Sequence, residues 1–134
     1  MSLSVFQYVR RYPLSLVCLL LLFLLSFVPL FEDTPLNDIN FIDKWTHFVM
    51  YGGTTSVVWW EYLRSHSRID YRRLLTVTIV AMVVLGGVIE LLQAYCTTTR
   101  SGEWADFLAD VVGVLLGNGI GLILKQQKIW LKRR

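Results

Sequence analysis

Long hydrophobic stretches alternate with short polar segments along the whole chain. Each stretch holds about 18 to 23 residues, the length that a helix rising ~1.5 Å per residue needs to cross a ~30 Å hydrocarbon core. Short connections between successive spans favour antiparallel neighbours. The pattern predicts an all-α integral membrane protein, an up-and-down four-helix bundle that forms one domain over 1–134, with spans at about 14–31, 45–63, 74–96 and 104–124.

The charged residues divide between the two ends of these spans. One end carries eleven basic and two acidic residues, whereas the other carries two basic and eight acidic residues. Lys and Arg accumulate in the short cytoplasmic loops of membrane proteins. The asymmetry therefore predicts that both termini and the middle loop are cytoplasmic, and that the acidic residues lie near the outer face.

Composition decides how the basic charge is interpreted. With 54% hydrophobic and 17% charged residues, the chain is too apolar for a soluble domain of 134 residues. The net charge of +3 would suggest nucleic acid in a soluble protein, but here the basic residues flank membrane spans, which argues against that partner. Cys18 and Cys96 fall near opposite ends of their spans, too far apart for a disulfide. Their spacing predicts no thiol metal site, and no cofactor is expected.

Polar residues at helical spacing occupy the start of the second span. His47 follows Asp43 by four residues and Lys44 by three, and Tyr51 follows His47 by four, so one helix face presents them together. Structural roles also exist for Asp43 as a helix cap, for Lys44 as an interfacial side chain and for Tyr51 as part of an aromatic belt. His47 fits such a role poorly, because an ionisable side chain within a span normally faces a partner inside the bundle.

The third and fourth spans carry carboxylates at a similar depth. Glu90 shares a helix face with Gln93, and its structural alternative is a tether between helices. Asp106 and Asp110 begin a stripe on the fourth span, and two acids one turn apart in a membrane helix call for a cation, a shared proton or a basic partner. Arg100, in the preceding loop, is the nearest fixed charge. The stripe continues through small residues that favour close helix packing: Gly113, Gly117 and Gly121.

Each of these polar side chains requires a partner, and the partners at the same depth are one another. The sequence therefore predicts a polar pocket near the outer ends of the spans. Its expected binding residues are Asp43, Lys44, His47, Tyr51, Glu90, Gln93, Arg100, Asp106 and Asp110.

The same motifs resemble those of the VanZ-like family. They are D-K-x-x-H-x-x-x-Y from Asp43, E-x-x-Q from Glu90, then Arg100, then D-x-x-x-D-x-x-G-x-x-x-G from Asp106, and together they cover about 43–121. The resemblance implies a small four-span protein of the bacterial cytoplasmic membrane, with a link to glycopeptide (teicoplanin) resistance. The family commonly has Asn where this chain has Asp110, so the resemblance also implies that Asp110→Asn is tolerated.

Two functions from different classes fit these residues. In the favoured one, a non-enzymatic membrane protein binds the headgroup of an envelope lipid or lipid-linked precursor. Lys44 and Arg100 would hold an anionic group such as phosphate, while His47, Gln93 and the carboxylates would accept hydrogen bonds from amines or sugars. Membrane lipids are then the expected partners, and the oligomeric state is left open. A groove open sideways to lipid between helices, with Lys44 and Arg100 at its mouth, would favour this function.

The alternative is an intramembrane enzyme that acts on a lipid headgroup. The catalytic candidates are residue types that serve as general acids or bases, or as hard ligands for a divalent metal: His47, Glu90, Asp106 and Asp110. A nucleophile is not evident, since Ser101 and Thr97–Thr99 qualify by position alone. A proton-coupled transporter is disfavoured, because four short spans form a small pathway.

Overall fold

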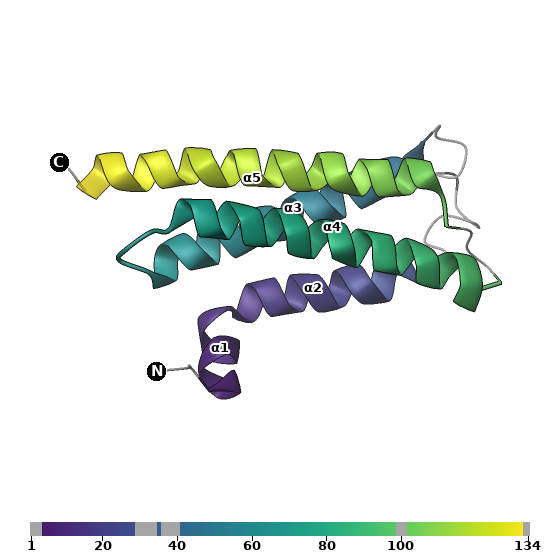
Figure 1. The fold of residues 1–134 in the computed structure, drawn as a ribbon, viewed down its shortest axis with the longest axis horizontal. Coiled ribbons are helices and arrows are strands. Elements are labelled where there is room, and N and C mark those ends of the chain that lie inside the picture. The colour runs from purple at the N-terminus through teal and green to yellow at the C-terminus, as the bar shows by residue number, and fades with distance from the viewer. Residues whose placement is uncertain (1–3, 29–34, 36–40, 99–101, 133–134) are drawn as a thin grey trace.

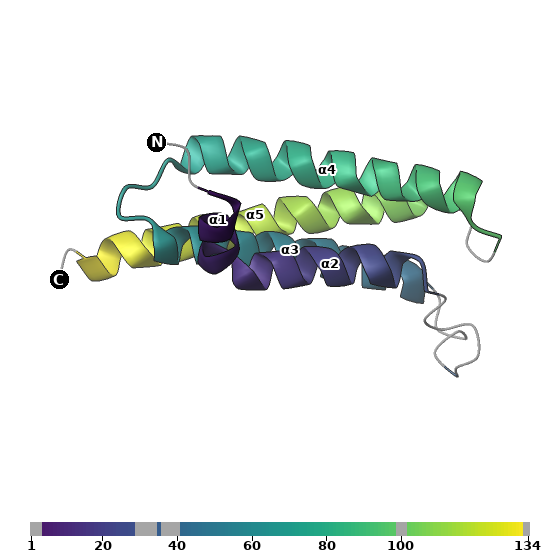
Figure 2. The ribbon, with the colours of Figure 1, turned by 90° about the horizontal axis from the view of Figure 1, so that it is seen from below.

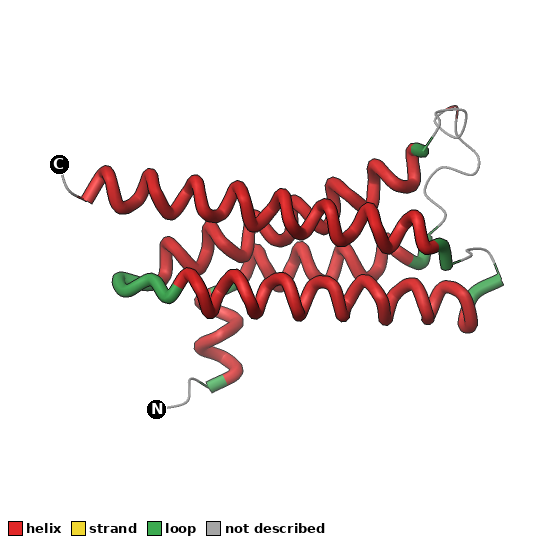
Figure 3. The backbone as a smooth tube through the Cα atoms, turned by 45° about the horizontal axis from the view of Figure 1, so that its top comes forward, coloured by secondary structure: helices red, strands yellow, loops and turns green. Residues whose placement is uncertain are grey.

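The described part of the chain is entirely helical. The structure is a computed structural model that describes residues 4–28, 35, 41–98 and 102–132, and these contain no strand (Figure 3). The helices are α1 (Val5–Arg11), α2 (Pro13–Ser26), α3 (Ile42–Ser65), α4 (Tyr71–Cys96) and α5 (Trp104–Lys132). The predicted all-α fold is confirmed.

Four of the helices, α2 to α5, run side by side along the long axis of the molecule, and α1 turns away from them (Figures 1 and 2). Helix α3 packs most extensively against α5, while α4 also packs on α5 and α2 packs on α3. The start of α3, the end of α4 and the start of α5 lie together at one end of the molecule (Figure 1). Helix α1 and the last turns of α5 lie toward the other end.

The first predicted span is shorter and more bent than expected. Helix α2 ends at Ser26 rather than at residue 31, and α1 precedes it at an angle of 91°. Pro13 begins α2, and because its ring carries no amide hydrogen and restricts the preceding residue, the helix cannot continue from α1 through this point. The two helices together are apolar enough for a span, so the pair is a broken span or a re-entrant segment.

Among the described helices, α4 and α5 are each long and apolar enough to cross a membrane. Helix α3 is long enough but less apolar, because charged residues lie near both of its ends and its buried face carries polar side chains such as Thr54 and Thr55. By length and composition, the described part of the chain therefore has two helices that could span a bilayer, or three if the α1–α2 pair counts as one span. The four-span bundle and the side on which the termini lie stay predictions.

The distribution of side chains is that of a membrane protein. Large aliphatic residues face outward along α4 and α5, with Leu91 60%, Leu108 61% and Ile123 58% exposed, whereas Thr55 and Asn118 are buried. Exposed apolar surface on this scale is unfavourable in water and favourable against lipid. Polar side chains inside a span normally face the protein interior, as they do here.

Asn118 ties three helices together near the middle of the interior. Its Oδ1 accepts hydrogen bonds from Trp59 Nε1 of α3 at 2.7 Å and from Thr78 Oγ1 of α4 at 2.6 Å, and its Nδ2 donates to the carbonyl oxygen of Val114. This contact was not predicted. It satisfies polar groups that hydrocarbon would leave unpaired.

Glu61 also joins two helices by buried hydrogen bonds, near the opposite end of the molecule from the predicted pocket. Its buried carboxylate accepts hydrogen bonds from the backbone amides of Leu14 and Ser15, at 3.0 and 2.8 Å, and from Ser15 Oγ at 2.7 Å. Because Tyr12 supplies no side-chain cap, Glu61 satisfies the free amides at the start of α2. The negative charge also suits the positive end of the helix dipole.

The glycine stripe of α5 forms a close seam with α3. A Cβ atom placed on Gly117 would lie 2.6 Å from the carbonyl oxygen of Gly52, and one placed on Gly121 would overlap the Trp59 ring. Only a residue without a side chain permits this approach. The stripe is therefore a packing surface, as its small residues predicted.

Gly117→Leu should destabilise the protein by at least about 2 kcal/mol, because the new side chain must displace α3 backbone rather than flexible atoms. Gly119→Leu is the matched control, since nothing lies within 4 Å of a Cβ atom at that position. Thermal unfolding in detergent should show a lower Tm for Gly117→Leu only. Equal stability of the two variants, with ligand binding lost in Gly117→Leu, would instead identify the stripe as a ligand surface.

Candidate functional site

Five of the nine predicted pocket residues converge at the shared end of α3, α4 and α5. Lys44 and His47 come from the first turns of α3, Glu90 from the second half of α4, and Asp106 and Asp110 from the first turns of α5. Gly86 of α4 makes room for this meeting, because a Cβ atom there would lie 2.9 Å from Asp110 Oδ2. Alternation of helix direction thus brings together residues that are up to 66 positions apart (110 − 44).

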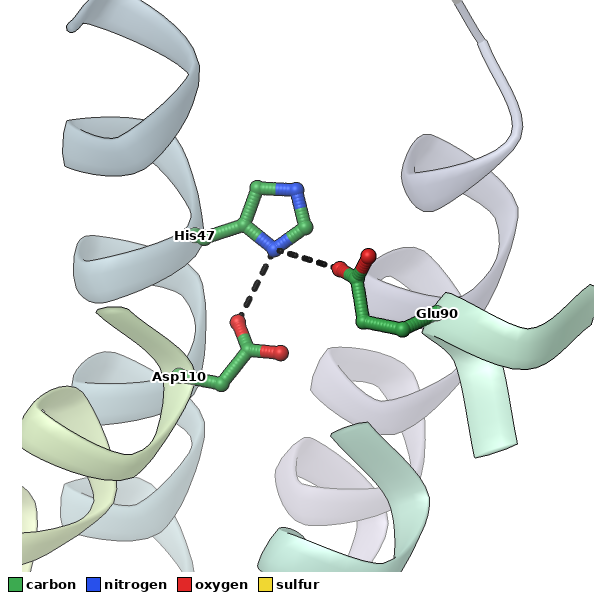
Figure 4. A group of neighbouring side chains, drawn as sticks. All are labelled: His47, Glu90 and Asp110. Atoms are coloured by element: carbon green, nitrogen blue, oxygen red, sulfur yellow. Dashed lines mark hydrogen bonds and ion pairs between the residues drawn. The ribbon is translucent and has the colours of Figure 1, made fainter. Parts of the chain in front are cut away.

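His47 lies at the centre of the cluster (Figure 4). Its Nδ1 is 2.9 Å from Asp110 Oδ1 and 3.8 Å from Glu90 Oε1, while its Nε2 is 3.9 Å from Asp106 Oδ2. His47 is 4% exposed and Asp110 is fully buried. A carboxylate therefore lies near each ring nitrogen of the imidazole, and the ring is shielded from solvent. Electrostatic interactions are strong in such an environment.

Lys44 bridges two acidic residues at the rim of the cluster. Its Nζ is 2.9 Å from Glu103 Oε2 and 3.1 Å from Asp106 Oδ1. Glu103 was not among the predicted site residues, although it lies three positions before Asp106 and therefore on the same side of the helix start. This three-residue spacing is the feature of the sequence from which Glu103 could have been predicted as a site residue. Because two carboxylates already engage the ammonium, Lys44 is less suited to hold a phosphate than the sequence suggested.

Glu90 is held by the loop that precedes α5. Its Oε2 accepts a hydrogen bond of 2.9 Å from the backbone amide of Glu103, and Gly102 packs against the Glu90 carbonyl so closely that a Cβ atom there would clash. The other carboxylate oxygen, Oε1, is left to face His47 (Figure 4). The loop thus fixes the orientation of the Glu90 carboxylate.

Three of the predicted residues lie outside this set of ion pairs: Gln93, Asp43 and Tyr51. Gln93 is buried but donates a hydrogen bond from Nε2 to the carbonyl oxygen of Ser26, at 2.5 Å, and so ties α4 to the end of α2. Asp43 is exposed in the first turn of α3. Tyr51 is fully buried one turn below His47, with the two rings parallel to within 5° and 6.5 Å between centroids. Arg100 lies outside the described residues.

Within the described residues, the cluster carries an excess of acidic groups. Four carboxylates, those of Glu90, Glu103, Asp106 and Asp110, surround one ammonium and one imidazole. Even with a protonated imidazole, four negative charges less two positive ones leave a surplus of two. Buried like charges repel strongly, so the cluster calls for a proton or an additional cation.

An apolar groove of about 610 Å³ runs between α4 and α5 beside the cluster. Its wall consists mostly of aliphatic and aromatic side chains, and its polar members are Glu90 and Glu103. The apolar lining residues include Val84, Val88, Leu91, Tyr95, Trp104 and Phe107. The groove therefore joins a hydrophobic surface to the acidic cluster.

No family model matches the chain, and neither a curated protein nor a solved structure does. The VanZ-like resemblance therefore rests on the motifs alone.

Proposed function

We propose that this protein binds the headgroup of an envelope lipid, or of a lipid-linked envelope precursor, at the cluster around His47. The observation that carries the proposal is the groove between α4 and α5, whose mostly apolar lining includes the carboxylate residues Glu90 and Glu103. A groove of this kind suits a molecule with an apolar chain and a polar head, because ligand sites are mostly apolar with a few converging polar groups.

The charges of the cluster favour a headgroup that donates hydrogen bonds. Glu103 lies half exposed at the rim and Glu90 faces the groove, so amine or sugar hydroxyl groups would meet carboxylate acceptors there. Lys44 supplies positive charge next to them, but it is shared between Glu103 and Asp106. A zwitterionic or sugar-bearing headgroup fits this arrangement better than a purely anionic one.

Val88→Trp should reduce the lipid that copurifies with the protein by at least about tenfold, because a ring in the groove excludes an acyl chain and steric overfilling costs about 1–3 kcal/mol. Lipid per protein would be measured by mass spectrometry after gentle extraction. Val80→Trp is the matched control, since Val80 is equally apolar and 57% exposed on the same helix without lining the groove. Equal lipid loss in both variants would argue against the groove.

The topology proposed here has four membrane segments in a bacterial cytoplasmic membrane: the α1–α2 pair, α3, α4 and α5. Both termini would be cytoplasmic and the cluster would lie near the outer face. The excess of Lys and Arg at the termini and in the α3–α4 loop supports this orientation. Membership of the VanZ-like family, and with it a link to teicoplanin resistance, is proposed from the ordered motifs.

Reporter fusions after Arg134 should be active with a cytoplasmic reporter and silent with a reporter that works only outside the cytoplasm. The reason is the eleven-to-two basic excess at that end of the helices. A fusion in the α3–α4 loop, after Ser67, should behave in the same way. Activity of the external reporter at either position would overturn the orientation and the placement of the site.

An intramembrane enzyme acting on the same headgroup is the second candidate. The observation that favours it is the pair formed by His47 and Asp110, in which a buried carboxylate orients an imidazole at 2.9 Å, as general-base catalysis requires. The suggested nucleophiles do not strengthen it: Thr97 donates its hydroxyl to the Gln93 carbonyl, and residues 99–101 lie outside the described part. Turnover of a lipid substrate that is lost in His47→Gln would establish this alternative.

A further inference from the structure

We propose that His47, Glu90 and Asp110 bind a divalent transition-metal ion, with Zn²⁺ as the best fit. Each residue offers one ligand atom, and these atoms all lie within 4.8 Å of one another. They come from three different helices and point toward a common centre (Figure 4). The ligands would be His47 Nδ1 together with one carboxylate oxygen each from Glu90 and Asp110.

Two of the three distances between the proposed ligand atoms are close to those of a tetrahedral site, and the third, between the two carboxylate oxygens, is at most 4.8 Å. Zinc bonds to nitrogen and oxygen are about 2.0–2.2 Å, so neighbouring ligands in a tetrahedron lie roughly 3.3–3.6 Å apart. Nδ1 of His47 lies 2.9 Å from Asp110 Oδ1 and 3.8 Å from Glu90 Oε1, on either side of that value. Shifts of a few tenths of an ångström in side chains would accommodate an ion.

Buried acceptors without hydrogen-bond donors give an independent reason for a ligand here. Glu90 and Asp110 are both buried, with 8% and 0% of their surface exposed. Glu90 Oε1 and Asp110 Oδ2 are inaccessible and accept no hydrogen bond. The hydroxyl of Tyr51, whose ring stacks on His47, is likewise buried without a hydrogen-bond partner. Buried polar atoms normally have partners, so this group of unpaired oxygens points to a missing cation or a missing donor.

The surroundings of the three residues match those of known kinds of metal site. A metal-binding histidine usually directs its other ring nitrogen to a carboxylate, and here Nε2 of His47 faces Asp106 Oδ2 at 3.9 Å. Lys44 in turn fixes Asp106, and the Glu103 amide fixes the second oxygen of Glu90. The Glu90 carboxylate is therefore already oriented by another group, and Asp106 is held by Lys44 on the Nε2 side of His47, at a distance longer than a hydrogen bond.

The donor set selects the class of ion. Calcium and magnesium prefer oxygen ligands alone, whereas an imidazole nitrogen suits zinc and other first-row transition metals. A histidine that ligates a metal is neutral, so four carboxylates and one ammonium then leave a surplus of three negative charges, which a divalent ion would reduce to one. With three protein ligands, the fourth position stays open for water or for an oxygen of a bound headgroup. Metal binding itself does not depend on the lipid proposal.

The test measures zinc directly on the full chain in detergent, after lipid removal and treatment with a chelator. Cys18→Ser/Cys96→Ser protein serves as the background, because free thiols also bind zinc. After equilibration with zinc chloride and removal of free metal, elemental analysis should find about one zinc per chain. His47→Gln and Glu90→Gln should each weaken zinc affinity by more than about a hundredfold. His66→Gln, the second histidine of the chain, should keep full affinity.

X-ray absorption spectroscopy of the zinc-loaded protein identifies the zinc ligands without any substitution in the site. It should show one imidazole nitrogen with oxygen ligands at about 2.0–2.2 Å. No zinc retained by the background protein, full affinity in His47→Gln, or zinc lost in His66→Gln would each overturn the site. Failure of lipid binding with one zinc retained would reject the proposed function alone.

Discussion

Glu90→Ala should lower copurifying lipid by more than about tenfold while the protein still inserts and folds. Truncating one member of a buried hydrogen-bonded charge cluster costs about 2–5 kcal/mol in binding, and about 1.4 kcal/mol corresponds to a factor of ten. Glu90 is such a member, because the Glu103 amide donates a hydrogen bond to one of its oxygens and the other oxygen faces His47 beside the groove. Insertion should improve slightly, because the variant removes a charge from a membrane helix.

Gln93→Ala is the matched control for this variant. Gln93 lies one turn from Glu90 on the same helix and is as deeply buried, but its hydrogen bond goes to the Ser26 carbonyl rather than to the cluster. It should lower Tm through the lost tether and leave lipid content unchanged. Lipid retained in Glu90→Ala, or lost equally in both variants, would contradict the placement of the headgroup.

Asp110→Asn and Asp106→Asn should differ in their effect on zinc affinity. Asp110 is a proposed ligand, so replacing its carboxylate by a neutral amide should weaken zinc binding by more than about a hundredfold. Asp106 faces Nε2 of His47 at 3.9 Å and is proposed as a positioning residue, and changes of this kind cost about 10–100-fold. Zinc competition with a chelator measures both affinities, and an unchanged Tm would show that the losses are not losses of fold.

The VanZ-like resemblance makes the opposite prediction for Asp110. If Asn is acceptable at that position, Asp110→Asn should be tolerated, whereas Asp106→Asn should impair function. The structure gives Asp110 the shortest contact with His47, which argues for a specific role of its carboxylate. A tolerant Asp110→Asn with normal zinc content would remove Asp110 from the metal site.

Helix periodicity alone predicted much of the cluster. Lys44, His47, Glu90, Asp106 and Asp110 were expected to meet because each lies at the same depth and no polar side chain is stable alone in hydrocarbon. The structure brings these five together. Spacing and membrane energetics were sufficient for this step, since antiparallel helices leave few ways to arrange their ends.

The remaining contacts depend on rotations and bends that the sequence does not specify. Gln93 shares a face with Glu90, but α2 lies close enough to accept its hydrogen bond instead. No partner was predicted for Glu61, which lies near the end of the second predicted span, and the bend at Pro13 places the start of α2 against it. Neither the register of α2 nor the groove between α4 and α5 could be predicted, because both follow from tertiary packing.

Native mass spectrometry of the gently extracted full chain tests the central claim most directly. The account predicts a chain that carries about one lipid or lipid-linked molecule, retained under mild activation, because the groove and the cluster hold both of its ends. The same adduct should be missing from Val88→Trp and from Glu90→Ala and present in Val80→Trp. A bare chain, or an adduct of equal abundance in all four proteins, would contradict the claim that this cluster is a headgroup-binding site.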